Sequence, residues 1–194
     1  ILISCFSLSL YGKRKEAPAK NIEDELQFKA GDEAGNEVKA LKAELLISRN
    51  DERAQKQLET LLRKYRGTAM EASIQFRMAE LYMRRSKTST FFELKKDNSD
   101  VIKFTPNTVK KVSSRGWIQK AVSTYDLIEH KFVHFRDMDL VLFNNAFARQ
   151  MLGQDKEAMA RYNRVIEDHP GSPLVPDSHL AIGEYYFSSK KFQA

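Results

Sequence analysis

Four small residues recur along this chain at nearly regular intervals, and this recurrence limits the possible fold more than any other feature. They are Ala43, Ala79, Ala146 and Gly183, each within an amphipathic segment, and the intervals between them are 36, 67 and 37 residues. The middle interval exceeds one period by about 31 residues, which predicts an insertion within one repeat. Each small residue predicts a close approach of two helices, which a bulky side chain would prevent.

A second amphipathic segment follows each of the first three small residues. Small, aromatic and aliphatic side chains recur there at helical spacing. The stripes are Ala54, Leu58, Leu61 and Leu62; then Ala121, Tyr125 and Ile128; then Ala158, Tyr162 and Val165. Pro170 disfavours helix at the residue before it, so the third unit is predicted to end there. The fourth unit stops before its second helix, which predicts a domain that is incomplete at its C-terminus.

These positions resemble the tetratricopeptide repeat family. The third unit carries the resemblance best, with Ala146, Gly153, Ala158, Tyr162 and Pro170; the second supplies Ala79, Tyr82, Ala121 and Tyr125, and the fourth Gly183 and Tyr186. Arg149 departs from the pattern, because the family usually has a large apolar or aromatic residue there, and the first unit is degenerate. The resemblance implies an all-α solenoid of antiparallel helix pairs over residues 37–194, with an insertion at about 88–116.

The corner sequence "HPGSPLVPDS" and the intervals of 36 and 37 residues are similar to a branch of the family found in the bacterial cell envelope. This branch includes proteins of the Tol–Pal coordinator type and of the outer-membrane assembly lipoprotein type. The likeness implies an exported protein, although fold-level similarity does not identify a partner.

The resemblance also implies a concave groove lined by the first helix of each unit. The side chains at its usual lining positions are Phe76, Glu80 and Met83, with Arg84 directly after them; Leu140, Phe143, Phe147 and Gln150; and Asp177, Leu180, Glu184 and Phe187. This mixed aromatic and acidic lining predicts binding of an extended or helical peptide. The alternative is that several of these residues belong to the core.

The opening run Ile1 to Tyr11 is apolar and is followed by basic residues. It is shorter than the roughly twenty residues that span a bilayer, and it has the length of a signal-peptide core. Residues 1–12 are therefore predicted to be a signal-peptide remnant or an anchor, and residues 13–36 a polar linker. The segment "LISC" resembles a bacterial lipobox, which makes Cys5 a candidate for lipidation and membrane association. The alternative is a buried or disordered N-terminal strand.

The insertion is rich in basic residues with phenylalanines between them. Its cations are Lys95, Lys96, Lys103, Lys110, Lys111 and Arg115, and its aromatic residues are Phe91, Phe92 and Phe104. The pattern predicts that the preceding helix extends through Leu94 and that a basic partner-binding arm follows it. The alternative is a solvated excursion whose phenylalanines pack on neighbouring helices.

The histidines and glycines of the chain do not form a recognisable catalytic or metal-binding motif. His130 and His134 have helical spacing, but Lys131 stands where the zinc metalloprotease motif requires glutamate. No glycine-rich phosphate loop and no nucleophile–base pair is recognisable, so no catalytic residue, metal, cofactor or small-molecule substrate is predicted. The charge of +6 is spread among acidic residues, as on a solvated surface. The acidic side chains at groove positions, Glu80, Asp177 and Glu184, disfavour binding of nucleic acid in the groove. Nucleic acid could bind only through the insertion.

The sequence therefore predicts a non-catalytic scaffold that binds proteins or peptides in a bacterial cell-envelope assembly, in the periplasm or at the outer membrane. One alternative is the regulatory or substrate-docking part of a larger enzyme. A weaker alternative is a cytoplasmic nucleic-acid or ribonucleoprotein adaptor.

Overall fold

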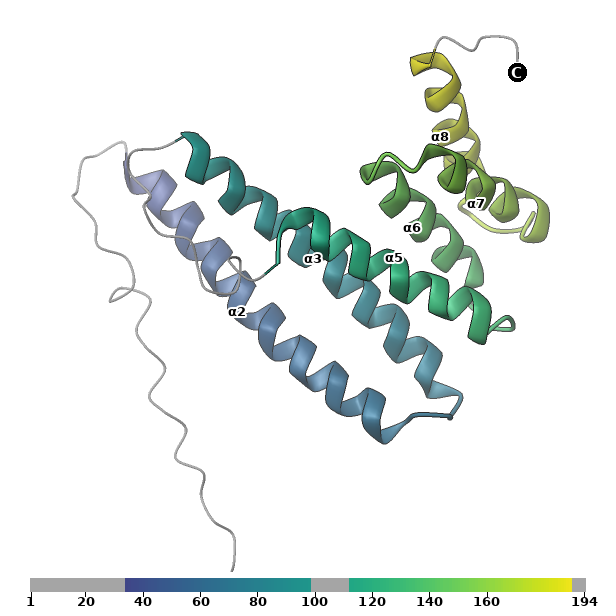
Figure 1. Cartoon of the computed structure of the whole chain (residues 1–194), viewed down its shortest axis with the longest axis horizontal. Helices are drawn as coiled ribbons and strands as arrows, with labels where there is room; N and C mark the ends of the chain where they lie inside the picture. The colour runs from purple at the N-terminus through teal and green to yellow at the C-terminus, as the bar shows by residue number, and fades with distance from the viewer. Residues whose placement is uncertain (1–33, 99–111, 190–194) are drawn as a thin grey trace, which may run out of the picture.

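The computed structural model describes residues 34–98 and 112–189, and the regular elements within these ranges are all α-helices. In chain order they are α2 (Ala34–Lys64), α3 (Met70–Asn98), α5 (Ser114–Lys131), α6 (Met138–Met151), α7 (Asp155–Asp168) and α8 (Val175–Ser188). The helices pack in sequential antiparallel pairs, each against the next one along the chain (Figure 1). The predicted all-α helical array is thus confirmed.

Several predicted features lie outside the described residues. These are the opening run with Cys5, the linker up to residue 33, and Phe104, Lys103, Lys110 and Lys111 of the insertion. Among the described helices, none combines the length and the hydropathy that a bilayer span requires.

The turn between α6 and α7 depends on one glycine. Gly153 has a φ of 75°, in the left-handed region that a residue with a side chain rarely adopts. The amides of Gly153 and Gln154 donate to the carbonyl oxygens of Gln150 and Arg149, both at 2.9 Å. These bonds satisfy carbonyl groups that the end of α6 leaves without a helical partner. Gly153, one of the residues that carry the resemblance to the tetratricopeptide repeat, thus forms the turn between the two helices.

The corner between α7 and α8 also forms where the prolines predict it. α7 ends at Asp168, His169 caps it, and Pro176 lies in the first turn of α8. Proline fits the first turn because the amide hydrogen that it lacks has no partner in the helix. The Ser172 hydroxyl donates to Asp139 at 2.6 Å and so ties the corner to α6.

The predicted close packing of helices at the small residues of the second and third units is confirmed. Ala79, Ala121, Ala146 and Ala158 are all fully buried, with 0% exposure, as is Ile128. The larger residues of the predicted stripes lie beside them: Tyr125, Tyr162 and Val165 are each at most 1% exposed. The structure therefore packs aromatic rings between helices that the alanines allow to approach closely.

The first unit is not a helix pair, and here the sequence prediction was wrong. α2 continues without a break through the residues predicted to form a second helix. No glycine or proline occurs between Glu37 and Arg66, so nothing in the sequence interrupts the helix. Ala43 is exposed, and Leu41 and Leu45 are buried instead.

The second misassigned small residue is Gly183. It is exposed, and a Cβ built on it meets no other atom within 4 Å. No described helix crosses α8 at this position, so the predicted close approach is absent from the described part of the chain.

The start of the insertion is helical rather than a loop. α3 continues through Leu94, as predicted, and ends only at Asn98. Phe92 is 2% exposed, so its ring packs in the core and not on an arm. Glu93 accepts a hydrogen bond from the backbone amide of Ser114 at 2.8 Å, and Ser113 caps α5 through Gly116. The two helices that flank the insertion are therefore joined directly.

Candidate partner-binding groove

A cavity of about 530 Å³ lies between α3, α5 and α6. We call it the α3–α6 groove, defined by Arg77, Glu80, Met83, Arg84 and Lys87 of α3, Tyr125 of α5, and Asn144 and Phe147 of α6. Four of the side chains predicted to line a groove are brought together here, namely Glu80, Met83, Arg84 and Phe147.

The α3 wall of the groove is a helical stripe. Residues 77, 80, 84 and 87 recur at intervals of three or four, so they lie on one face of the helix. Tyr125 forms the floor and is 1% exposed. Burial is the main reason why the pKa of Tyr125 lies far above its usual value, so its hydroxyl stays neutral.

The charges of the groove differ from those of the mixed aromatic and acidic lining that the sequence predicted. Glu80 forms an ion pair with Arg77 at 2.7 Å, which neutralises the one carboxylate of the lining. Arg84 reaches across to Asp51 of α2 at 2.6 Å. Lys87 is exposed and forms no ion pair with any residue that the structure describes. The free charge in the groove is therefore positive.

Asp51 stands behind the groove wall and is almost completely buried. Its side chain is 3% exposed, whereas that of Arg84 is 58% exposed. Nε of Arg84 donates a hydrogen bond to Oδ1 at 2.8 Å, and Nη2 forms the ion pair with the same oxygen, whereas Oδ2 of Asp51 has no hydrogen-bond partner within the described ranges. Because a buried carboxylate without a counter-charge is costly, Arg84 has a structural role as well as a place in the groove.

Apolar surface is also available in the groove. Phe147 is 46% exposed although it is a large hydrophobic residue, and Met83 beside it is half-buried. Exposed aromatic side chains within a concavity are typical anchors for a partner.

Three other predicted groove residues have structural contacts instead. Phe76 is 6% exposed and packs in the core, with its ring 6.1 Å from those of Tyr125 and Phe135, so its assignment to the groove was wrong. Phe143 packs edge-on against Tyr162 at 5.4 Å. Gln150 accepts a hydrogen bond from the Tyr162 hydroxyl at 2.8 Å.

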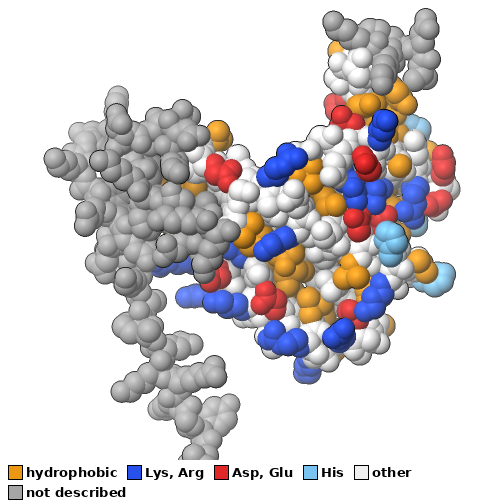
Figure 2. All heavy atoms as spheres, viewed as in Figure 1, with side chains coloured by type: hydrophobic (Ala, Val, Ile, Leu, Met, Phe, Trp, Pro, Cys, Tyr) orange, Lys and Arg blue, Asp and Glu red, His pale blue; other side chains and the backbone are white. Residues whose placement is uncertain are grey.

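The remaining predicted groove residues are exposed but do not line this cavity. Leu140 lies on α6, and Asp177, Leu180, Glu184 and Phe187 lie on α8. Phe187 is 74% exposed and Leu180 60%, and apolar side chains are visible on the arm that α8 forms in Figure 2.

The basic insertion is described only at its edges. Lys95 is half-buried and has an interaction partner, and Lys96 lies in α3. Arg115 is exposed and donates a long hydrogen bond, 3.4 Å, to the carbonyl oxygen of Leu152. The predicted basic arm is therefore not assembled from the residues that the structure describes.

An ion network between α5, α6 and α7 was missed by sequence reasoning. Its members are Asp126 and Glu129 of α5, Asn145 and Arg149 of α6, and Arg161 and Arg164 of α7. Arg161 bridges the two carboxylates at 2.9 and 2.8 Å, and Arg164 reaches Glu129 at 3.0 Å. Basic and acidic side chains lie next to one another over the α6–α7 part of the face shown in Figure 2.

The network explains why Arg149 departs from the family pattern. Its guanidinium donates to both oxygens of Asp126, at 2.8 and 2.7 Å, and is only 12% exposed. Burial acts to raise the pKa of Asp126, but hydrogen bonds from Asn145 and Arg149 and the charges of Arg149 and Arg161 outweigh it. The pKa of this carboxyl is therefore lowered. The sequence signal was the arginine itself, at a position that usually packs an aromatic side chain.

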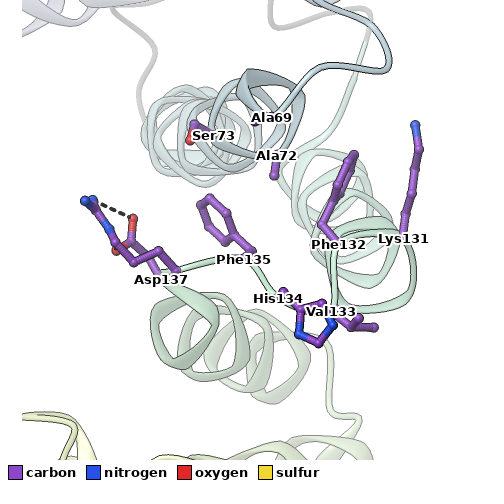
Figure 3. A pocket seen from close by; sticks show the side chains of 10 residues that line it. Ala69, Ala72, Ser73, Lys131, Phe132, Val133, His134, Phe135 and Asp137 are labelled. Atoms are coloured by element: carbon purple, nitrogen blue, oxygen red, sulfur yellow. Dashed lines mark hydrogen bonds and ion pairs between the residues drawn. The ribbon is translucent and has the colours of Figure 1, made fainter.

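A second cavity, also about 530 Å³, lies at the connection between α5 and α6 and is shown in Figure 3. In that view Phe135 points toward Ala72 and Ser73 of α3. Lys131 pairs with the buried Glu71 at 2.6 Å, and the amide of Gly67 donates to the other oxygen of Glu71, also at 2.6 Å. The bond from Lys131 is the main reason why the pKa of Glu71 is lowered. These contacts fix the end of α5 to the start of α3.

His130 and His134, the two histidines at helical spacing, have different surroundings. Nδ1 of His130 is 2.6 Å from the carbonyl oxygen of Asp126, and His134 lines the cavity at the α5–α6 connection. Across the described ranges, no three His, Cys, Asp or Glu side chains form a group that could hold a metal ion.

The comparisons with known proteins agree with the repeat in one part of the chain. A family model described as the tetratricopeptide repeat matches residues 141–172, which cover most of α6, all of α7 and the start of the proline corner. No curated protein and no solved structure matches the chain. A repeat of this kind indicates binding of proteins or peptides in general.

Proposed function

We propose that this chain is a non-catalytic scaffold that binds a segment of a partner protein in the α3–α6 groove. The observation that carries the proposal is the position of Phe147, which is 46% exposed within a cavity that also holds Met83 and Lys87. An exposed aromatic side chain beside a cation that has no ion pair among the described residues offers a partner both apolar contact and charge.

The scaffold holds this site rigidly. The groove residues come from helices rather than loops, and α5 packs against both α3 and α6. Because these helices are already packed, binding of a partner requires little further ordering of their backbone.

Site-specific photocrosslinking in the full-length protein tests this proposal. A photoreactive phenylalanine analogue at Phe147 is expected to give discrete crosslinked products in the native cells. The matched control is the same analogue at Leu127 of α5, which is 41% exposed and does not line the groove. Equal crosslinking from both positions would contradict the proposal.

The proposed setting is the bacterial cell envelope. Its support is the apolar run Ile1 to Tyr11 and the similarity of the proline corner to envelope tetratricopeptide proteins. The test is the intact mass of the full-length protein purified from separate cell fractions. Processing near Ser9 to Gly12, or a lipid adduct on Cys5, in the envelope fraction is expected. An unprocessed cytoplasmic species would refute this setting without affecting the groove.

A further inference from the structure

We infer that the segment bound in the α3–α6 groove is acidic and carries a bulky apolar side chain. The inference rests on the proposed function and adds to it the chemistry of the partner. It follows from the charges that remain free in the groove and from the apolar surface between them.

The charge of the groove is positive after its internal pairs are removed. Three cations line it, and its one carboxylate, Glu80, is paired with Arg77. Arg84 is paired with Asp51, but only through Nε and Nη2, so Nη1 is left without a hydrogen-bond partner among the described residues. Lys87, one helical turn from Arg84, is exposed and forms no ion pair with a described residue. A carboxylate of a partner can therefore bind between Arg84 and Lys87.

The apolar part of the groove lies beside these cations. Met83 and Phe147 face the same cavity, and the buried Tyr125 closes its floor. A large apolar side chain of the partner would cover the exposed part of Phe147 and remove it from water. The same contact would partly exclude water around Lys87 and so strengthen its ion pair.

A protein segment fits these features better than nucleic acid does. A nucleic-acid strand needs a row of cations along its phosphates and aromatic rings that stack on its bases. Here a carboxylate lies within the groove, and Phe147 is its one exposed ring.

The first experiment selects ligands without assuming their sequence. A random peptide library displayed on phage is selected on the full chain, and the enriched peptides are tested on Phe147→Ser and on Leu127→Ser. Both positions carry exposed apolar side chains, but only Phe147 lines the groove. We expect enriched peptides in which Asp or Glu stands near Phe, Trp, Leu or Met. Their binding is expected to fall by about tenfold with Phe147→Ser, as for loss of an aromatic anchor, and to persist with Leu127→Ser.

The second experiment measures the contribution of charge to peptide binding. The strongest peptide is synthesised with an amidated C-terminus, together with a counterpart in which Asn and Gln replace Asp and Glu. Lys87→Glu is expected to weaken binding of the acidic form by about five- to tenfold, because it places like charges together, and to leave the neutral form unchanged. Lys156→Glu, at an exposed position of α7, makes the same change in net charge outside the groove and is the control.

The outcomes separate this inference from the proposed function. Groove-dependent peptides that are neutral or basic would overturn the inference and leave the proposed function in place. Absence of any groove-dependent peptide would overturn both. Single-stranded oligouridine that binds the chain, and loses binding with Lys87→Glu while no peptide is enriched, would overturn both in favour of nucleic acid.

Discussion

Arg149 of α6 donates to both carboxylate oxygens of Asp126 of α5, at 2.8 and 2.7 Å, where a tetratricopeptide repeat usually packs an aromatic side chain. The arginine also donates to Asn145 at 3.2 Å and to Gln154 at 3.0 Å, so each nitrogen of its guanidinium has a partner. The helix pair is thus joined to its neighbour by hydrogen bonds at a place where burial of a ring would be expected.

Replacing Arg149 by methionine is expected to destabilise the fold. The substitution keeps apolar volume but leaves Asp126 with fewer hydrogen bonds in a partly buried place. We expect the free energy of unfolding to fall by about 1–3 kcal/mol, as measured by urea denaturation. The double variant Arg149→Met, Asp126→Asn should recover part of this loss, since the unmatched charge is gone. A loss below about 0.5 kcal/mol, which is typical of surface substitutions, would contradict a stabilising role.

The Asp126 carboxylate also makes stability depend on pH. Its pKa is lowered in the folded protein, because hydrogen bonds and arginine charges outweigh the effect of burial. It therefore contributes stability that is complete above the pKa of an unfolded aspartate, about 3.9, and that is lost as the pH falls through the lower folded value. The difference in unfolding free energy between the natural protein and Asp126→Asn should be constant above about pH 5 and shrink below about pH 4.

Urea titrations from neutral to acid pH measure this difference. Ser123→Ala, at an exposed position of α5, alters no ionisable group and is the control. A difference for Asp126→Asn that stays constant until the protein unfolds in acid would exclude the carboxylate as its source.

Arg84 and Lys87 are neighbours in the groove, but they should differ in their effect on stability. Arg84→Ala removes the counter-charge of the buried Asp51 and is expected to cost about 1–3 kcal/mol of unfolding free energy. Lys87→Ala removes an exposed cation and should change stability by less than about 0.5 kcal/mol. Thermal or urea denaturation of the two variants checks this contrast. If Arg84→Ala lost as little stability as Lys87→Ala, the buried Asp51 would have to find another partner in that variant.

Gly183→Ala is expected to stabilise the chain. No atom lies within 4 Å of the added methyl group, and alanine is favoured over glycine within a helix by about 0.5–1 kcal/mol. Ala146→Leu is the contrasting variant, because Ala146 is 0% exposed and overpacking of a core costs about 1–3 kcal/mol. A higher melting temperature for the first and a lower one for the second are expected. Destabilisation by Gly183→Ala would show that another helix covers that position.

Sequence reasoning succeeded where packing alone decides the residue. Ala79 and Ala146 lie between helices that approach closely, so a small side chain is required at both. Their spacing therefore indicates the repeat. Ala43 was misassigned because alanine is also common on exposed helix surfaces, and no residue after it interrupts α2. In both kinds of position the amino acid is the same, and only its neighbours in space distinguish them.

The groove was predictable only in part for a related reason. Helical spacing correctly placed Glu80 and Arg84 on one face of α3, but it could not show that Glu80 is neutralised by Arg77 or that Asp51 lies behind Arg84. The free charge of a surface depends on pairs made across helices, such as one between residues 51 and 84. The sign of the free charge in the groove could therefore be determined only from the structure.

The packing of each helix against its neighbour in sequence also has a kinetic consequence. The contacts between elements join segments that are close along the chain, so little loop-closure entropy opposes their formation, and the array should fold rapidly. It should also open in steps, because α8 covers the cluster of Ala146, Ala158 and Tyr162 and can detach while α3 and α5 stay paired. Amide hydrogens of α8 should then exchange with solvent well before those of the α3–α5 pair, which gives the molecule a melting order that runs along its length.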